Sequence, residues 1–245
     1  MILAGHALSK AGFLHGFSTR KGGVSPPPYD TWDFALDHDA VHLDANLDRL
    51  GEAVGFDRAR LYQAKQVHGA RVLAADGDPR AMREGAEGDA ILATIAGDAA
   101  LVRVADCVPV LVADRASGRV AAIHAGWPGI VCRVIPSALE ALGAGSFLAA
   151  IGPSIGPCCF EVDGGVADRI GAACRGASLR TPEHAPGKTF VDLRRAARRQ
   201  LLEMGVADAD IEDVPGCSRC NADLFYSWRR DGERSGRQVG VIVAR

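Results

Sequence analysis

Short runs of aliphatic and β-branched residues recur along the chain and predict strands. Each run is bounded by polar or turn-forming residues and is too short for a typical helix. The predicted strands are 61–63, 72–73, 90–94, 100–104, 108–113, 120–123, 147–151 and 238–243. Ser117-Gly118 separates two of these runs, so 108–113 and 120–123 are expected to pair as a hairpin.

Apolar residues at helical spacing predict three helices. One covers 128–142, where apolar residues recur every four positions, and the others cover 166–174 and 192–204, the last ending at Gly205. Segments 26–28 and 183–188 are predicted loops. Strands and helices are intermixed without a βαβ rhythm, and no repeat or linker divides the chain. We therefore expect a single α+β domain over residues 1–245.

Composition excludes several classes of protein. Hydrophobic residues make up 48% of the chain and charged residues 24%, which is ordinary for a globular protein. The net charge of −2 gives no electrostatic reason to expect a nucleic acid partner. No apolar run approaches ~18 residues, so no membrane partner is expected. Seven cysteines and no visible signal peptide indicate reduced thiols in the cytoplasm.

One cysteine and two histidines offer the strongest candidate chemistry. Cys107 and His124 each follow an apolar, strand-like run, and His68 precedes Gly69. A lone cysteine in such a run is usually a packing residue. Here Asp106 precedes Cys107 and Pro109 follows, so we expect the chain to break or bulge at the cysteine. A thiolate and two imidazoles would form a three-ligand zinc site with an open position, where a bound water has a pKa near ~7.

The same residues stand in motifs that resemble a known family. The motifs are Gln66-Val67-His68-Gly69, Ala105-Asp106-Cys107-Val108-Pro109-Val110 and His124-Ala125-Gly126-Trp127, with further matches over 15–25, 151–162, 225–232 and 236–237. The chain resembles the YfiH/YlmD family, once called laccase-like or polyphenol oxidase. That family includes enzymes of the purine nucleoside phosphorylase and adenosine deaminase type and a peptidoglycan-editing factor.

This resemblance implies a fold and a metal site. The implied fold has β-sheets covered by helices and is related to cysteine-hydrolase folds. The implied ligands of a zinc ion are His68, Cys107 and His124. One position departs from the family pattern, because Pro128 stands where the family usually has arginine. Proline cannot bind an anion as a guanidinium does, so metal binding is unaffected and phosphate recognition is put in question.

Two other patterns bear on metal chemistry. Cys217-Ser218-Arg219-Cys220 is a C-x-x-C motif, and a structural zinc site of four cysteines usually has a second such motif. Cys158-Cys159 is an adjacent pair and does not have that spacing. We therefore expect the cysteines of both segments to pack or to line a pocket. The seven histidines include no H-x-H pair, which argues against a multicopper oxidase. A site of two histidines and one cysteine could still take up copper. The motifs of cytidine-type deaminases are absent.

Arginine residues are candidates for binding an anion. Arg20 lies beside Gly22-Gly23, whose backbone amides could help to bind phosphate, and the alternative is a buried ion pair with Asp89 or Asp106. Gln66 and Asp106, from the family motifs, complete the predicted substrate-binding residues. Four arginines on one sector of a predicted helix are expected to form a solvated face, namely Arg194, Arg195, Arg198 and Arg199.

The leading hypothesis is a zinc-dependent enzyme that phosphorolyses adenosine, inosine or guanosine, deaminates adenosine, or does both. Its small-molecule partners would be a purine nucleoside and phosphate. The alternatives are an amidase acting on a peptidoglycan precursor through zinc, a metal-free enzyme with Cys107 as nucleophile and His124 or His68 as base, a copper polyphenol oxidase, and a non-catalytic zinc-stabilised binding protein.

Overall fold

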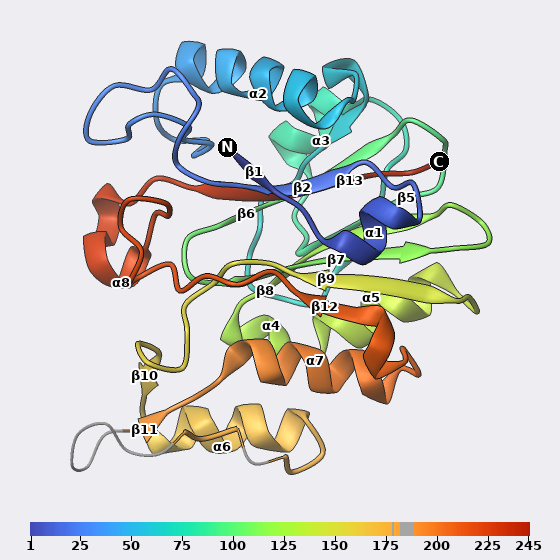
Figure 1. The fold of residues 1–245 in the computed structure, drawn as a ribbon, viewed down its shortest axis with the longest axis vertical. Coiled ribbons are helices and arrows are strands. Elements are labelled where there is room, and N and C mark those ends of the chain that lie inside the picture. The colour runs from blue at the N-terminus through green and yellow to red at the C-terminus, as the bar shows by residue number, and fades with distance from the viewer. Residues whose placement is uncertain (178, 182–188) are drawn as a thin grey trace.

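Two β-sheets stack face to face, and helices cover both outer faces (Figure 1). The computed structural model describes residues 1–177, 179–181 and 189–245. The five-stranded sheet has the order β1 (Ile2–Leu3), β2 (His15–Ser18), β13 (Gln238–Val243), β6 (Ala99–Val104) and β3 (Leu61–Tyr62). The six-stranded sheet has the order β12 (Ile211–Asp213), β9 (Phe147–Ile151), β7 (Val108–Asp114), β8 (Val120–Ala125), β5 (Ala90–Ala93) and β4 (Val72–Ala74).

The helices lie outside this pair of sheets. α2 (Ala40–Val54) packs on the five-stranded sheet, with α3 (Pro79–Gly85) nearby. α4 (Trp127–Val131), α5 (Val134–Leu142) and α7 (Leu193–Glu203) cover the six-stranded sheet, and α6 (Gly164–Ala173) packs against α4 from outside. The shorter elements are α1 (His6–Lys10), α8 (Trp228–Asp231) and the pair β10 (Glu161–Val162) and β11 (Thr189–Phe190), with 3₁₀ helices at Arg58–Arg60, Asp208–Asp210 and Gly232–Arg234. Among the described helices, none has the length and apolar character needed to cross a bilayer.

Three hydrophobic cores follow from this layering. One fills the space between the two sheets, one lies under α2, and the largest lies between the six-stranded sheet and its helices. All seven residues of β7 are buried, because this strand has a core on each face. That double burial explains why the sequence of β7 is an almost unbroken apolar run rather than an alternating one.

The strand predictions are confirmed, including the hairpin, in which Val110 pairs with Ile123. The expected break at the cysteine also occurs, since residues 105–107 connect β6 of one sheet to β7 of the other. Pro109, however, lies inside β7. It stands next to the end of the β7–β9 pairing, which begins at Val110 and Ile151, where a residue without an N–H is tolerated.

The helix predicted over 128–142 is wrong, because the structure has two helices there. Arg133, between them, adopts a left-handed conformation with φ of 64°. Pro136 gives the physical reason: in a continuous helix its ring would meet the carbonyl group of Cys132. In α5 the proline instead lies in the first turn, where its missing N–H is not needed.

The other predicted helices are confirmed as α6 and α7. The loop predicted over 26–28 lies outside every helix and strand, whereas 183–188 falls outside the described residues. α2 was not predicted, although Leu43, Leu47, Leu50 and Val54 give it an apolar face and Asp39 caps its first turn.

Asp114, at the end of β7, gives a test of local stability. Its buried carboxylate accepts hydrogen bonds from Ser117 Oγ at 2.5 Å, Ser146 N at 3.1 Å and Ala116 N at 3.3 Å. The bond from Ser117 is the main reason that the pKa of Asp114 is lowered to about 2. These bonds hold the β7–β8 turn.

We expect Asp114→Asn to lower the free energy of unfolding at pH 7 by about 1.5–3 kcal/mol, because hydrogen bonds to a charged group are lost. A carboxyl group with a lowered folded-state pKa stabilises the protein above its unfolded pKa of about 3.9. The difference between variant and wild type should therefore shrink as the pH falls from about 4 to about 2. Urea titrations at several pH values measure it, with the exposed Asp223→Asn as control. Equal losses in both variants would contradict the assignment.

Candidate active site

His68, Cys107 and His124 come together from three separate segments. His68 lies in the loop between β3 and β4, Cys107 immediately precedes β7, and His124 is the next-to-last residue of β8. Their donor atoms all lie within 4.8 Å of one another, and Cys107 Sγ is 3.7 Å from His68 Nε2. In a tetrahedral zinc site a sulfur and a nitrogen ligand would be roughly 3.5 Å apart. The three donors are therefore spaced as ligands of one metal ion would be.

Asp89 positions both histidines. This fully buried carboxylate accepts a hydrogen bond from His124 Nδ1 at 2.8 Å and from the backbone N–H groups of His68 at 2.9 Å and Gly69 at 2.7 Å. Because Nδ1 of His124 donates its proton to Asp89, Nε2 is left to bind a metal. Asp89 was not among the predicted site residues. Its position directly before a buried strand was the available signal, because a buried carboxylate there needs partners.

Backbone conformation also marks the site. His68 and Asp106 have φ of 60° and 90°, in the region that non-glycine residues rarely adopt. Gly126 follows β8 and touches the cluster. A Cβ atom there would lie 2.8 Å from His68 Cδ2 and 2.9 Å from Cys107 Sγ. Glycine is therefore required at this position for the histidine and the cysteine to approach each other.

Cys107 and His124 shift each other's pKa values in opposite directions. Burial would raise the pKa of the Cys107 thiol, but His124 and His68 outweigh this effect and the pKa falls to about 6. Burial would lower the pKa of His124, but Cys107 and Asp89 raise it to about 9. Without a metal ion, each group therefore favours the charged form of the other, and a bound metal ion would replace the proton on Nε2 of His124. The thiolate is the form that binds metals and attacks electrophiles.

These residues open into a cavity of about 740 Å³. Pockets of roughly 300–1,000 Å³ are typical for small-molecule ligands. Three aromatic side chains line it, namely Trp127, Phe160 and Trp228. Four basic side chains also line it, namely Lys65, Arg103, Arg229 and Arg237, against the two acids Asp37 and Asp106. The lining thus suits a ligand with a flat ring and a negative charge.

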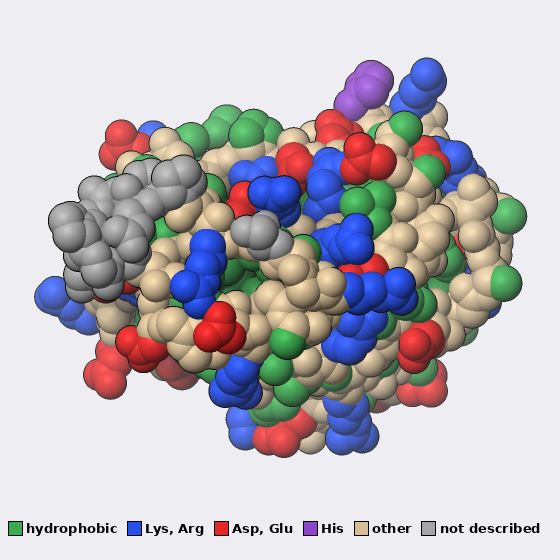
Figure 2. Space-filling view, turned by 90° about the horizontal axis from the view of Figure 1, so that it is seen from below, with side chains coloured by type: hydrophobic (Ala, Val, Ile, Leu, Met, Phe, Trp, Pro, Cys, Tyr) green, Lys and Arg blue, Asp and Glu red, His purple; other side chains and the backbone are tan. Residues whose placement is uncertain are grey.

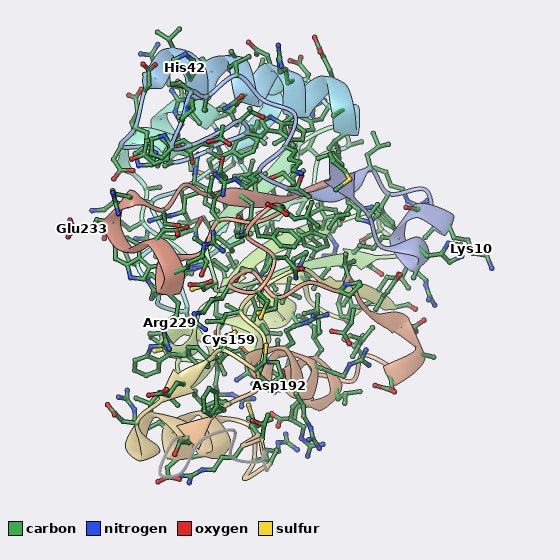
Figure 3. All side chains as sticks on the ribbon, turned by 60° about the vertical axis from the view of Figure 1, so that its left-hand side comes forward. Lys10, His42, Cys159, Asp192, Arg229 and Glu233 are labelled. Carbon is green, nitrogen blue, oxygen red and sulfur yellow. The ribbon has the colours of Figure 1, made fainter. Side chains whose placement is uncertain are left out.

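Asp106 and Arg229 are joined at one wall of the cavity. The Asp106 carboxylate accepts a hydrogen bond from the backbone N–H of Arg229 at 2.6 Å and from Ser218 Oγ at 2.6 Å. The Arg229 guanidinium lies 5.5 Å from the centre of the Phe160 ring. Figure 3 labels Arg229 and Cys159, the neighbour of Phe160, in the same part of the molecule. The backbone of Arg229 is therefore tied to the residue next to Cys107, while its guanidinium lies near the Phe160 ring and lines the cavity.

Gln66 and Arg103 form another wall. Gln66 Nε2 donates to the Arg103 carbonyl group at 2.7 Å, and its Oε1 accepts from the Arg103 N–H at 2.7 Å. Gln66 therefore lines the cavity but chiefly ties the His68 loop to β6. Burial lowers the pKa of Arg103 to about 9, and within the described part of the chain its Nη1 has no hydrogen-bond partner.

Arg20 is not among the residues that line the cavity. Its guanidinium donates to the carbonyl groups of Asp30 at 2.9 Å, Ala222 at 3.1 Å and Pro28 at 3.1 Å, and it lies 4.7 Å from the centre of the Tyr226 ring. The structure thus gives Arg20 the task of holding loops together. The alternative prediction, that Arg20 forms an ion pair instead of binding phosphate, agrees better with the structure. The partner of Arg20 is the Asp30 carboxylate, at 3.8 Å, rather than Asp89 or Asp106.

The solvated face predicted for the arginines of α7 is confirmed only in part: Arg195 and Arg199 are exposed, whereas the side chains of Arg194 and Arg198 are only 18% and 25% exposed. Arg194 and Arg198 pair with Asp213, and Arg199 pairs with Glu203. Figure 2 shows basic and acidic side chains intermixed on the face seen from below, without a broad surface of one sign.

The expectation for the remaining cysteines needs correction. Cys158 and Cys159 meet Cys217 and Cys220 in space, and all four sulfur atoms lie within 4.8 Å of one another. An adjacent pair of cysteines can therefore complete a group of four with a distant C-x-x-C motif, rather than only packing or lining a pocket as expected from the sequence.

The chain is similar in sequence to one family model and to several curated proteins. The family model described as multi-copper polyphenol oxidoreductase laccase matches residues 14–245. A protein named purine nucleoside phosphorylase from Streptomyces coelicolor is 37% identical over 93% of this chain and 93% of its own length. The purine nucleoside phosphorylase YfiH of Escherichia coli is 35% identical, over 92% of this chain and 91% of its own.

Solved structures show the same fold. YlmD from Geobacillus stearothermophilus superposes with a TM-score of 0.86 at 31% identity and covers 96% of this chain and 93% of its own. The Neisseria meningitidis protein NMB0706 has a TM-score of 0.82 at 29% identity, covering 94% of this chain and 93% of its own.

Proposed function

The chain belongs to the family of multi-copper polyphenol oxidoreductase laccase, the YfiH/YlmD family, and we propose that it is a zinc-dependent purine nucleoside phosphorylase. The observation that carries the proposal is the His68, Cys107 and His124 donor set, held by Asp89 inside a cavity with aromatic and basic walls. The names of the similar curated proteins support the choice of reaction.

Zinc suits the donor set. One thiolate and two imidazoles, with a carboxylate behind one imidazole, match catalytic zinc sites that keep a fourth position open. Copper could bind the same donors. In the described part of the chain, the other group that could hold a metal contains four cysteines and no histidine. The many imidazoles of a multicopper centre are therefore not gathered in the described residues, so the donor groups do not support multicopper oxidase chemistry for this chain.

Different residues of the cavity can serve different steps of phosphorolysis. Trp127, Phe160 and Trp228 can stack on a purine ring, and the basic side chains can neutralise phosphate. Asp106, with its carboxylate fixed by Ser218 and Arg229, can accept a hydrogen bond from a ribose hydroxyl group. A zinc ion held by His68, Cys107 and His124 would supply a Lewis acid. Adenosine deamination by the same site is a second activity within this proposal.

Product analysis tests the proposal. Purified protein is incubated with adenosine, inosine or guanosine, with and without phosphate, and the products are identified by mass spectrometry. Phosphorolysis yields the free base and a ribose phosphate only when phosphate is present. Deamination yields inosine from adenosine in either condition. If none of these products forms, the proposed function is wrong.

Arg229→Gln is expected to weaken phosphate use. We expect kcat/KM for phosphate to fall by about 10–150-fold, which corresponds to loss of one charge-assisted contact of roughly 1.5–3 kcal/mol. Arg234→Gln is the matched control, because Arg234 is exposed and is not among the cavity-lining residues. Steady-state kinetics at varied phosphate give the result. If both variants keep the wild-type phosphate dependence, Arg229 is not the anion-binding residue.

A metal-free cysteine enzyme is the second candidate, and one observation favours it. Cys107, His124 and Asp89 form a chain of thiolate, imidazole and carboxylate, the arrangement of a cysteine nucleophile with its base. Such an enzyme could cleave an amide of a cell-wall precursor. Full turnover by protein shown to contain no metal would favour this candidate over the zinc enzyme.

A further inference from the structure

Four cysteines gather on two loops beside the cavity. They are Cys158 and Cys159, in the turn that follows β9, and Cys217 and Cys220, in the loop between β12 and α8. We call this set the four-cysteine cluster. The proposed phosphorolysis makes no use of it.

The sulfur atoms are spaced as in a tetrahedral metal site. Cys158 Sγ lies 3.6 Å from Cys159 Sγ, 3.7 Å from Cys217 Sγ and 3.6 Å from Cys220 Sγ, and Cys159 Sγ lies 3.3 Å from Cys220 Sγ. A tetrahedron with Zn–S bonds of about 2.3 Å has edges of roughly 3.8 Å. A disulfide would bring two sulfur atoms to about 2.05 Å. All four cysteines are free thiols.

The surroundings suit sulfur anions. The Gly156 N–H donates to Cys217 Sγ at 3.2 Å, and Arg219 Nη1 donates to Cys159 Sγ at 3.6 Å. A Cβ atom at Gly156 would lie 3.3 Å from two of the sulfur atoms, so glycine leaves room for them. The two loops are also joined directly, since Ser218 N donates to the Ser154 carbonyl group at 3.0 Å.

We propose that the four-cysteine cluster binds one Zn²⁺ ion through four thiolates. Each thiol releases its proton to solvent as its Zn–S bond forms, and nothing is oxidised or reduced. Four thiolates exceed the charge of the ion, and the Arg219 guanidinium and the Gly156 N–H offset part of the excess. A site with four protein ligands has no open position, so its role is structural.

A zinc ion in the four-cysteine cluster would stabilise one wall of the cavity. One of the two loops carries Ile155 and Phe160, which line the cavity. The other carries Ser218, whose hydroxyl group holds Asp106 next to Cys107. Zinc in the cluster would fasten these loops to each other without touching the substrate.

Cobalt spectroscopy in a Cys107→Ala background tests the proposal. This variant lacks the thiolate of the other metal site, so thiolate-to-cobalt charge transfer in the near ultraviolet can come only from the remaining cysteines. Apoprotein is titrated with Co²⁺ under reducing conditions. We expect a charge-transfer band and visible bands of tetrahedral cobalt that saturate at one ion per chain and vanish when Zn²⁺ is added. Adding Cys220→Ser should weaken the band, whereas adding the exposed Cys132→Ser should leave it unchanged.

Absence of the band in the Cys107→Ala protein would overturn the proposal, as would equal effects of the two serine variants. If the Cys220→Ser protein does not fold, alkylation of zinc-loaded wild-type protein decides the matter. The four cluster thiols should be protected until a chelator removes the metal, while Cys132 reacts throughout. Alkylation of the cluster thiols in zinc-loaded protein, or a mass deficit showing a disulfide among them, would contradict the site.

Discussion

Cys107→Ala is expected to abolish turnover and to remove the metal ion proposed for the His68–His124 pair, while the protein stays folded. Cys107 is the one thiolate in that donor set, and two imidazoles alone hold zinc poorly. We expect kcat/KM to fall by more than the roughly 10–100-fold that follows loss of an outer-shell residue. The melting temperature should change little, because a catalytic metal adds only part of the stability of a domain of this size.

Zinc content and steady-state kinetics measure this effect together. The variant should lose one zinc ion per chain and keep the ion of the four-cysteine cluster. Cys132→Ala serves as the control, since Cys132 is exposed and belongs to neither group of ligands. Full activity of the Cys107→Ala protein would exclude both the zinc enzyme and the cysteine nucleophile.

Asp89→Asn is expected to have the next largest effect. The substitution keeps the size of the side chain but removes the charge, and it turns one acceptor into a donor facing N–H groups. His124 would lose its fixed tautomer, and the loop that carries His68 would lose its anchor at Gly69. We expect zinc affinity at this site to fall by about 10–100-fold.

Competition with a chromophoric chelator measures the affinity, and kcat/KM should fall in parallel. Asp76→Asn is the matched control, because Asp76 is exposed and lies outside the cavity lining. An Asp89→Asn protein that held zinc as tightly as the wild type would show that this carboxylate does not position the ligands.

The strands could be predicted because buried strands consist of apolar residues, which stand out as short apolar runs in the sequence. β7 is buried on both faces, so its residues are apolar almost without interruption. The break between α4 and α5 was harder to predict, because Val134, Ala138 and Leu142 keep the helical spacing of Ile130 across it. Pro136 was the signal for the break, since a proline in the interior of a helix clashes with the carbonyl group four residues earlier.

The site could be predicted only in part, because some contacts join residues far apart in the chain. His68, Cys107 and His124 stood in recognisable motifs. Asp89 did not, and its role appears only when the β3–β4 loop is seen to fold onto its carboxylate. The meeting of Cys158-Cys159 with the C-x-x-C motif has the same origin, since spacing along the chain says nothing about two loops that pack together. Arg20 stands beside two glycines in the sequence, but its guanidinium donates to three backbone carbonyl groups, and proximity along the chain does not predict where a long side chain finds its partners.

Metal dependence of phosphorolysis tests the central claim most directly. The rate of inosine cleavage with phosphate is measured on one preparation as isolated, after removal of metal by a chelator, and after return of one or two equivalents of zinc. We predict that activity is lost with the metal and restored with zinc, in step with the metal bound at His68, Cys107 and His124. Unchanged cleavage by protein shown to be free of metal would contradict the account.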